Sequence, residues 1–227
     1  MEMNRERYEE IYNSLKPMVH DPNHGHPIQT NKEELFELVN VVDKIKPERI
    51  MEIGMLTGGS LKVWEQLLPV GGLLIGLDIW PHIINTPSWD YKSSDRDIRL
   101  IIKDSIDPSA FEEVKKILGD NLLDFLYIDG CHDIRHVEYE FKNFGSLVRK
   151  YGIIGFDDVY NVEGGAVRTL FPLITHANEW VMPTLDGGSS RIDSTPYAQK
   201  TGLYPTLKGK IWLFYYGGGC VGVWRKE

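Results

Sequence analysis

Residues 51–60 read Met-Glu-Ile-Gly-Met-Leu-Thr-Gly-Gly-Ser, and this stretch decides the fold of the 227-residue chain. The short apolar run 49–53 leads into a glycine-rich turn, after which Leu61, Trp64 and Leu68 recur at helical spacing. A strand, a tight turn and a helix in that order bring backbone N–H groups up to a bound nucleotide or carboxylate. The spacing E-x-G-x-x-x-G-G-S differs from the G-x-G-x-x-G of dinucleotide-binding turns, which argues against a dinucleotide ligand.

The composition is that of a globular protein, with 42% hydrophobic and 26% charged residues. The length predicts one domain with a large core. A net charge of -8 disfavours a surface for nucleic acid or an anionic membrane, so we expect neither partner. The N-terminus is charged and lacks an apolar signal core, no apolar run reaches the roughly 20 residues of a membrane span, and the two cysteines form no C-x-x-C pair. We therefore expect a cytoplasmic protein.

Strands and helices alternate along the middle of the chain. The apolar runs that we expect to form strands lie at 49–53, 73–77, 99–103, 122–128 and 152–156. Helical patterns at 108–119 and 133–149 separate the later strands. Such alternation, with almost wholly apolar strands, predicts an α/β fold with a parallel sheet covered by helices on both faces.

Two flanking regions belong to the predicted single domain, 1–227. The N-terminal helical extension, 1–46, contains a polar helix at 4–16 and a second helix that starts at the capping box Thr30-x-x-Glu33. These helices could serve a contact between subunits, so a homo-oligomer stays an open alternative.

The C-terminal region, 178–227, is rich in β-forming residues. We expect a helix near 164–176 before it, then a strand at 179–183 and a loop over 185–208. Two final runs, 211–216 and 220–224, are expected to pair antiparallel at one edge of the sheet.

Carboxylates follow four successive predicted strands, at Asp78, Asp104, Asp129 and Asp157, with Asp158 next in sequence. In a parallel sheet these strand ends meet at the edge where ligands bind. Five carboxylates there repel one another, which is costly unless cations or hydrogen bonds offset the repulsion. Each acid alone could instead cap the following helix, but that explanation fits the whole set poorly.

The positions of these acids suggest separate tasks. An acid at Asp78 can accept hydrogen bonds from two ribose hydroxyls, and Asp104-Ser105 lies within reach of an adenine ring and its exocyclic amine. The later acids form a partial set of oxygen ligands of the kind that Mg²⁺ prefers. His132 follows Asp129 by three residues, and a neutral imidazole there could take a proton from a hydroxyl.

Five motifs occur in order along the chain: Glu52-x-Gly54-x-x-x-Gly58-Gly59-Ser60, Asp78, Asp104-Ser105, Ile128-Asp129-Gly130-x-His132 and Phe156-Asp157-Asp158-Val159. Together they resemble the motifs of class I S-adenosylmethionine-dependent methyltransferases. The similar branch contains the catechol, macrolide and sugar O-methyltransferases and the cephalosporin-hydroxylase-like group, and Gly25-His26-Pro27-Ile28-Gln29 resembles the last of these. The resemblance runs from about residue 25 to 176.

The resemblance implies a Rossmann-like methyltransferase fold, with a seven-stranded, mostly parallel sheet and an antiparallel edge strand. It also implies a site for S-adenosylmethionine and a divalent metal, expected to be Mg²⁺. The cofactor residues would be Glu52, Gly54, Gly58 and Ser60 at the methionine part, Asp78 at the ribose, Asp104 and Ser105 at the adenine, and Asp129. The metal ligands would be Asp129, Asp157 and Asp158.

The chain departs from the catechol branch at two places. That branch has a lysine base shortly after the first metal aspartate, where this chain has Cys131 and His132. The sugar and macrolide branch has a histidine there, so we assign the base role to His132. The later pair is Asp157-Asp158 rather than Asp-Asn, which adds one negative charge.

These assignments predict O-methylation of a small hydroxylated molecule. Methyl transfer from a sulfonium needs the acceptor oxygen aligned behind the methyl carbon and stripped of its proton. A metal on that oxygen stabilises the anion, and a neighbouring oxygen can complete the chelate, so we expect vicinal oxygens as in a sugar, a catechol or a natural product. The alternatives are metal-independent N- or C-methyl transfer, nucleotide binding without methyl transfer, and a non-catalytic subunit-contact protein.

Aromatic segments are expected near the acceptor. Trp80 and Trp89 lie in a long loop after Asp78 and could form a lid, or else pack at the surface or against another subunit. The loop 185–208 is a second lid candidate. We expect His136 at a helix surface and Cys131 as a small packed thiol.

Overall fold

The computed structural model describes residues 3–18, 25–159, 179–183, 189–193, 209–216 and 219–226. Its main sheet has the strand order β3-β2-β1-β4-β5-β9-β8, and strands β6 and β7 form a separate pair. The strands are β1 Arg49–Ile53, β2 Leu73–Asp78, β3 Asp97–Ile102, β4 Leu123–Ile128, β5 Val148–Phe156, β6 Glu179–Pro183, β7 Ser189–Asp193, β8 Gly209–Tyr216 and β9 Gly219–Lys226.

Strands β3, β2, β1, β4 and β5 run parallel, which confirms the predicted α/β fold with a parallel sheet. Strand β9 pairs antiparallel with β5, and β8 pairs antiparallel with β9. The strand that runs opposite to the others is therefore second from the edge, and the prediction of an antiparallel strand at the edge itself is wrong. The strand bounds at 49–53 and 179–183 agree with the prediction.

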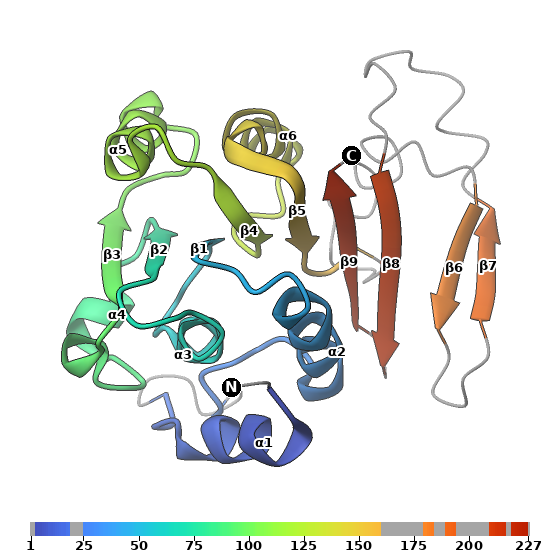
Figure 1. The fold of residues 1–227 in the computed structure, drawn as a ribbon, viewed down its shortest axis with the longest axis horizontal. Coiled ribbons are helices and arrows are strands. Elements are labelled where there is room, and N and C mark those ends of the chain that lie inside the picture. Colours follow the sequence, from blue (N-terminus) through green and yellow to red (C-terminus); the bar gives the residue numbers. More distant parts are fainter. Residues whose placement is uncertain are drawn as a thin grey trace.

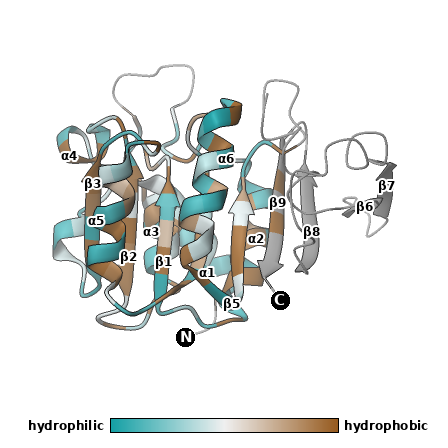
Figure 2. Ribbon diagram, turned by 90° about the horizontal axis from the view of Figure 1, so that it is seen from above, coloured by the Kyte–Doolittle hydropathy of each residue, from teal (hydrophilic) through white to brown (hydrophobic). Residues whose placement is uncertain are grey.

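Helices cover both faces of the sheet. Figure 1 shows α5 and α6 on one face and α2 and α3 on the other, with α1 beyond them. In Figure 2 strands β3 and β5 are largely brown, while α6 carries teal along much of its length. The helices are α1 Arg5–Ser14, α2 Lys32–Asp43, α3 Gly59–Glu65, α4 His82–Asn85, α5 Pro108–Leu118 and α6 Ile134–Asn143, with 3-10 turns η1 Tyr91–Ser93 and η2 Phe144–Leu147.

Each face of the sheet has its own hydrophobic core. On one side Val114 of α5 and Val137 of α6 pack with residues such as Phe156. On the other side Leu38 of α2 and Trp64 of α3 pack with their neighbours. Strand β4 lies between the two cores and is buried at every position, because alternate side chains enter opposite cores.

Two predicted helix bounds are wrong. The apolar stripe predicted a helix over 133–149, but α6 ends at Asn143 and β5 already begins at Val148, which pairs with Leu123 of β4. The side chain of Val148 is thus buried by the sheet. The expected capping box also fails, because Asn31, not Thr30, is the N-cap of α2, its side chain accepting from the Glu33 N–H.

The C-terminal predictions are tested only in part. The expected loop 185–208 contains strand β7, which pairs with β6. The rest of that loop and the expected helix near 164–176 lie outside the described residues. Within the described residues, no helix has the length and apolar character needed to cross a membrane.

Gly54 allows the loops after β1 and β4 to touch. Its φ is 89°, and a Cβ added there would lie 2.0 Å from the carbonyl oxygen of Asp129. Gly71 also has a positive φ, 74°, but an added Cβ would meet nothing within 4 Å. An alanine at Gly71 would therefore add backbone strain alone, whereas an alanine at Gly54 would add backbone strain and a steric clash.

We expect Gly54→Ala to lower the free energy of unfolding by more than about 3 kcal/mol, because strain and a backbone clash add. Gly71→Ala should cost only about 1–2 kcal/mol, from the left-handed backbone alone. Urea denaturation of both variants checks this. Equal losses in the two variants would show that the contact between Gly54 and Asp129 is not what requires glycine.

Candidate functional site

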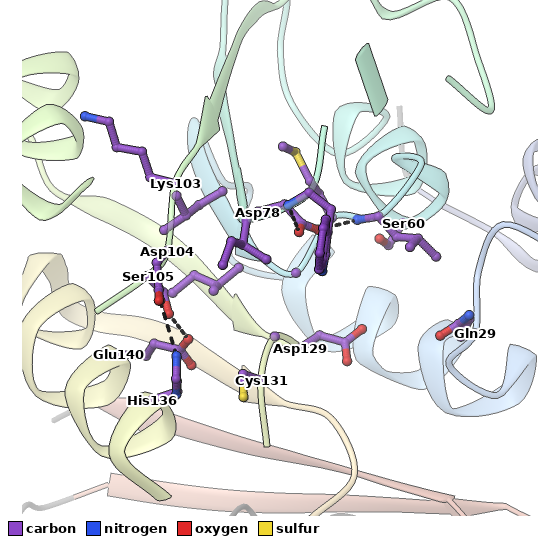
Figure 3. Close-up of a pocket in the computed structure, with 18 of the residues that line it drawn as sticks. Gln29, Ser60, Asp78, Lys103, Asp104, Ser105, Asp129, Cys131, His136 and Glu140 are labelled. Atoms are coloured by element: carbon purple, nitrogen blue, oxygen red, sulfur yellow. Dashed lines mark hydrogen bonds and ion pairs between the residues drawn. The ribbon is translucent and has the colours of Figure 1, made fainter. Parts of the chain in front are cut away.

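A cavity of about 420 Å³ lies beside the C-terminal ends of the parallel strands, as the sequence predicts for the ligand site. Figure 3 shows the lining side chains, with Ser60 and Gln29 on one side and His136 and Glu140 on the other. Among the predicted residues, those that line it are Gly54, Ser60, Asp78, Asp104, Ser105 and Asp129.

The glycine turn between β1 and α3 forms one wall of the cavity. Gly58 has a φ of 83° and is the N-cap of α3. A Cβ on Gly59 would lie 2.6 Å from the carbonyl oxygen of Pro27, so the N-terminal segment 27–30 packs directly on this turn. The indole N–H of Trp89 donates to the carbonyl of Gly58 (2.7 Å). Trp89 is thus a buried support of the turn, whereas Trp80 is 62% exposed and lines the cavity.

Glu52 lies behind this wall. Its side chain is fully buried, and its Oε1 accepts a hydrogen bond from the hydroxyl of Ser60 (2.6 Å). Its Oε2 has no hydrogen-bond partner in the described part of the chain. Burial raises the pKa of Glu52 to about 8, against the opposing effect of the Ser60 hydrogen bond. Glu52 therefore holds Ser60 in place but does not itself line the cavity.

Asp78 is held at the end of β2 by two backbone donors. Its Oδ2 accepts from the Leu56 N–H (2.8 Å) of the glycine turn, and its Oδ1 accepts from the Trp80 N–H (2.9 Å). A carboxylate has about four lone-pair sites, so two backbone bonds leave acceptor capacity for a ligand with adjacent hydroxyls.

Asp104 and Ser105 are held from helix α6. Asp104 Oδ1 lies 3.2 Å from His136 Nε2, and the hydroxyl of Ser105 donates to Glu140 Oε1 (2.5 Å). Both His136 and Glu140 line the cavity. The prediction of a surface role for His136 is wrong, since its side chain is only 16% exposed.

Two of the three predicted metal ligands meet. Asp157 is buried and Asp129 is partly buried, and burial, together with neighbouring negative charge, raises the pKa of both carboxyls. The hydroxyl of Thr30 donates to Asp157 Oδ2 (3.1 Å) and lies 3.3 Å from the hydroxyl of Tyr127. The cavity is lined by Asp129 but not by Asp157.

The third predicted metal ligand, Asp158, faces His132. Asp158 has a φ of 53°, and its Oδ2 lies 3.7 Å from Nδ1 of His132. Neither residue is among those that line the cavity. Among the described residues, no group of three His, Cys, Asp or Glu side chains has the arrangement of a metal site.

Three contributors to the site were not predicted from the sequence. They are the segment 27–30, Lys103 and Glu140. A usable signal existed for Glu140, because it follows His136 by four residues and so shares its helix face. The prediction that Cys131 is a packed thiol is also wrong, since this thiol is exposed at the cavity wall.

Solved structures place the fold among methyltransferases. The O-methyltransferase from Bacillus cereus in complex with SAH has a TM-score of 0.55 and 16% identity, with 97% of this chain and 90% of that chain covered. TomG, the Streptomyces achromogenes O-methyltransferase involved in tomaymycin synthesis, in complex with SAM, gives 0.57 and 12%, with 100% and 92% covered. A putative O-methyltransferase from Klebsiella pneumoniae gives 0.53 and 17%, with 98% and 89% covered.

The family follows from the sequence match. The model of the family described as Rhamnosyl O-methyltransferase/CmcI matches residues 20–168, about two-thirds of the chain, and this chain belongs to that family. No match was found among curated proteins. The family confirms the predicted resemblance and the prediction of an O-methyltransferase.

The buried carboxyl of Glu52 predicts a pH dependence of stability. Its folded-state pKa of about 8 exceeds the ordinary value of 4.5, so the folded protein retains a proton that the unfolded chain releases between these values. The stabilising effect is therefore complete below about pH 4.5 and is lost as the pH rises through about 8. The difference amounts to at most about 5 kcal/mol.

We expect Glu52→Gln to flatten the decline of unfolding free energy between about pH 5 and 8.5, because the amide cannot release a proton. Urea denaturation at several pH values gives the two slopes. Glu48→Gln, at a residue that precedes the same strand and is 66% exposed at its side chain, is the matched control. Parallel slopes for Glu52→Gln and the wild type would contradict the assignment.

Proposed function

We propose that this chain is an S-adenosylmethionine-dependent O-methyltransferase that acts on a hydroxyl of a small molecule with vicinal oxygens, assisted by Mg²⁺. The observation that carries the cofactor proposal is one cavity lined by the glycine turn, Asp78 and Asp104-Ser105. Membership of an O-methyltransferase family supports the reaction type.

The cavity offers a separate group for each part of the cofactor. The methionine end would lie at the turn, with Gly54, Gly58 and Ser60 close to it and Asp129 able to accept from the ammonium group. Asp78 would accept from the ribose hydroxyls. Glu52 would act behind the turn through Ser60.

The adenine would lie at the other end, at Asp104 and Ser105. Two of the similar structures are complexes with SAH or SAM, which supports the same class of ligand here.

His132 is the proposed base. Its Nδ1 faces Asp158, so Nε2 is the ring nitrogen left to take the proton from the acceptor hydroxyl. When Asp158 does not ligate a metal, its carboxylate would stabilise the imidazolium that forms. The cofactor supplies the methyl group on a sulfonium, and the protein aligns the acceptor oxygen behind it.

The donor chemistry at Asp129 and Asp157 fits a divalent cation in part. A bound cation would relieve the repulsion between these two neighbouring carboxylates, and oxygen ligands suit Mg²⁺. A cation bound there would lower the pKa of an acceptor hydroxyl. Asp158 is the proposed third ligand, although it faces His132 in this structure.

Methyl transfer without a metal is the second candidate, with an oxygen, nitrogen or carbon acceptor. The observation in its favour is that the three acids do not assemble into a metal site within the described residues.

We further propose that residues 1–227 form one domain, made up of the helical extension 1–46, the sheet and the C-terminal β-rich region 178–227. We propose that it works in the cytoplasm, and a homo-oligomer stays an open alternative. Trp80 remains a candidate lid residue.

Binding of S-adenosylhomocysteine, measured by calorimetry, tests the cofactor proposal. We expect binding of this ligand and none of NAD. Asp78→Asn should weaken binding about 10- to 100-fold, since charged hydrogen bonds to the ribose are lost. Asp97→Asn at the opposite end of the neighbouring strand is the control and should bind like the wild type. Binding of NAD alone would overturn the proposal.

Methyl transfer to a panel of catechols and vicinal diols tests the base and the metal. His132→Gln should lower kcat about 100-fold or more, because no group then takes the proton, whereas Arg135→Gln nearby should not. EDTA should abolish activity and Mg²⁺ restore it, and Asp157→Asn should raise the Mg²⁺ concentration required. Full activity in EDTA favours the metal-independent candidate.

A further inference from the structure

Helix α6 contacts the end of strand β3 through one face. His136 and Glu140, one turn apart on α6, reach Asp104 and Ser105, which follow β3. Figure 3 shows these four side chains gathered at one end of the cavity. We call these four residues the base-end cluster, after the adenine base that we propose to bind there.

Glu140 is the buried member of this cluster. Its side chain is fully buried, its Oε1 accepts from Ser105, and its Oε2 has no hydrogen-bond partner in the described part of the chain. Gly130 closes it from the β4 side, since a Cβ there would lie 3.5 Å from Glu140 Oε1. A buried carboxyl with one unpaired oxygen is costly, so its retention at a cavity wall calls for a function.

The hydrogen bond to Glu140 decides what Ser105 can offer a ligand. A hydroxyl has one proton to donate and two lone pairs to accept with. Because Ser105 donates its proton to Glu140, it presents only lone pairs in other directions. Asp104, an acceptor when ionised, lies beside it. The side chains of this end therefore match a ligand group that donates hydrogen bonds.

We propose that Glu140 is a positioning residue that fixes Ser105 as a hydrogen-bond acceptor and thereby makes this end of the cavity selective for a purine with an exocyclic amino group. The proposal rests on the proposed cofactor site. A 6-oxo purine would place its carbonyl oxygen against these lone pairs, and two acceptors cannot bond. Burial raises the pKa of Glu140 to about 7, so at about pH 8.5 the carboxylate can only accept.

The test compares S-adenosylhomocysteine with its 6-oxo analogue, which carries hypoxanthine, by calorimetry at about pH 8.5. The measured quantity is the ratio of the two dissociation constants. We expect the wild type to prefer the amino ligand at least about tenfold. Glu140→Met should bring the ratio within about threefold of unity, because the Ser105 hydroxyl can then turn and donate to the carbonyl. Glu140→Gln keeps an acceptor oxygen and should retain most of the preference.

Two more variants separate positioning from folding. Ser105→Ala should also reduce the ratio, and adding Glu140→Met to it should reduce it no further. Glu138→Met, the same change on α6 at a residue paired with Lys142 (2.6 Å), should leave the ratio unchanged. Thermal melts report whether each variant folds.

The outcomes are distinct. A purely structural role for Glu140 would weaken both ligands together and leave the ratio as in the wild type, which would overturn the proposal. If Glu140→Met does not fold, Ser105→Ala decides, and an unchanged ratio there overturns the proposal too. A wild type that binds neither ligand overturns the proposed function, and this inference with it.

Discussion

The site depends on a repeated backbone hydrogen bond at the ends of the parallel strands. The first residue after β1, Gly54, donates to Leu77 of β2, and Asp129 after β4 donates to Ile53 of β1. Asp157 after β5 in turn donates to Ile128 of β4. Each strand end is thus fixed against its neighbour, so the acids and the glycine turn leave the sheet in register. The close approach at Gly54 follows from this register.

The fixed register places three acidic residues, Glu52, Asp129 and Asp157, next to one another between the cavity and the hydrophobic cores. We call them the acidic layer. Burial raises the pKa of each, so keeping these carboxyls ionised has an electrostatic cost. Hydrogen bonds from Ser60 and Thr30 offset part of that cost. The layer therefore suits ligands with positive charge or hydrogen-bond donors, as the ammonium, ribose and amino groups of the proposed cofactor are.

The sequence predicted those parts of the fold and site that depend on local pattern. The run 49–53 forms a strand as predicted, and Asp78, Asp104 and Asp129 line the cavity, because apolar runs and strand ends are visible in the chain. The end of α6 was missed because Val148 fits a helical stripe, yet its pairing with Leu123, 25 residues earlier, decides its structure. The four-residue spacing that groups Glu140 with His136 is visible in the sequence, but the burial of Glu140 against Ser105 depends on tertiary packing.

The hydrogen bond from Thr30 to Asp157 joins groups 127 positions apart in the chain. Contacts of such separation are slow to form, because a long loop must close before they gain anything. The cavity wall that carries segment 27–30 is consequently completed only after β5 has docked on β4. A nascent chain that has emerged only as far as β4 cannot hold this site, so ligand affinity would arise late in synthesis, once about 70% of the sequence has folded.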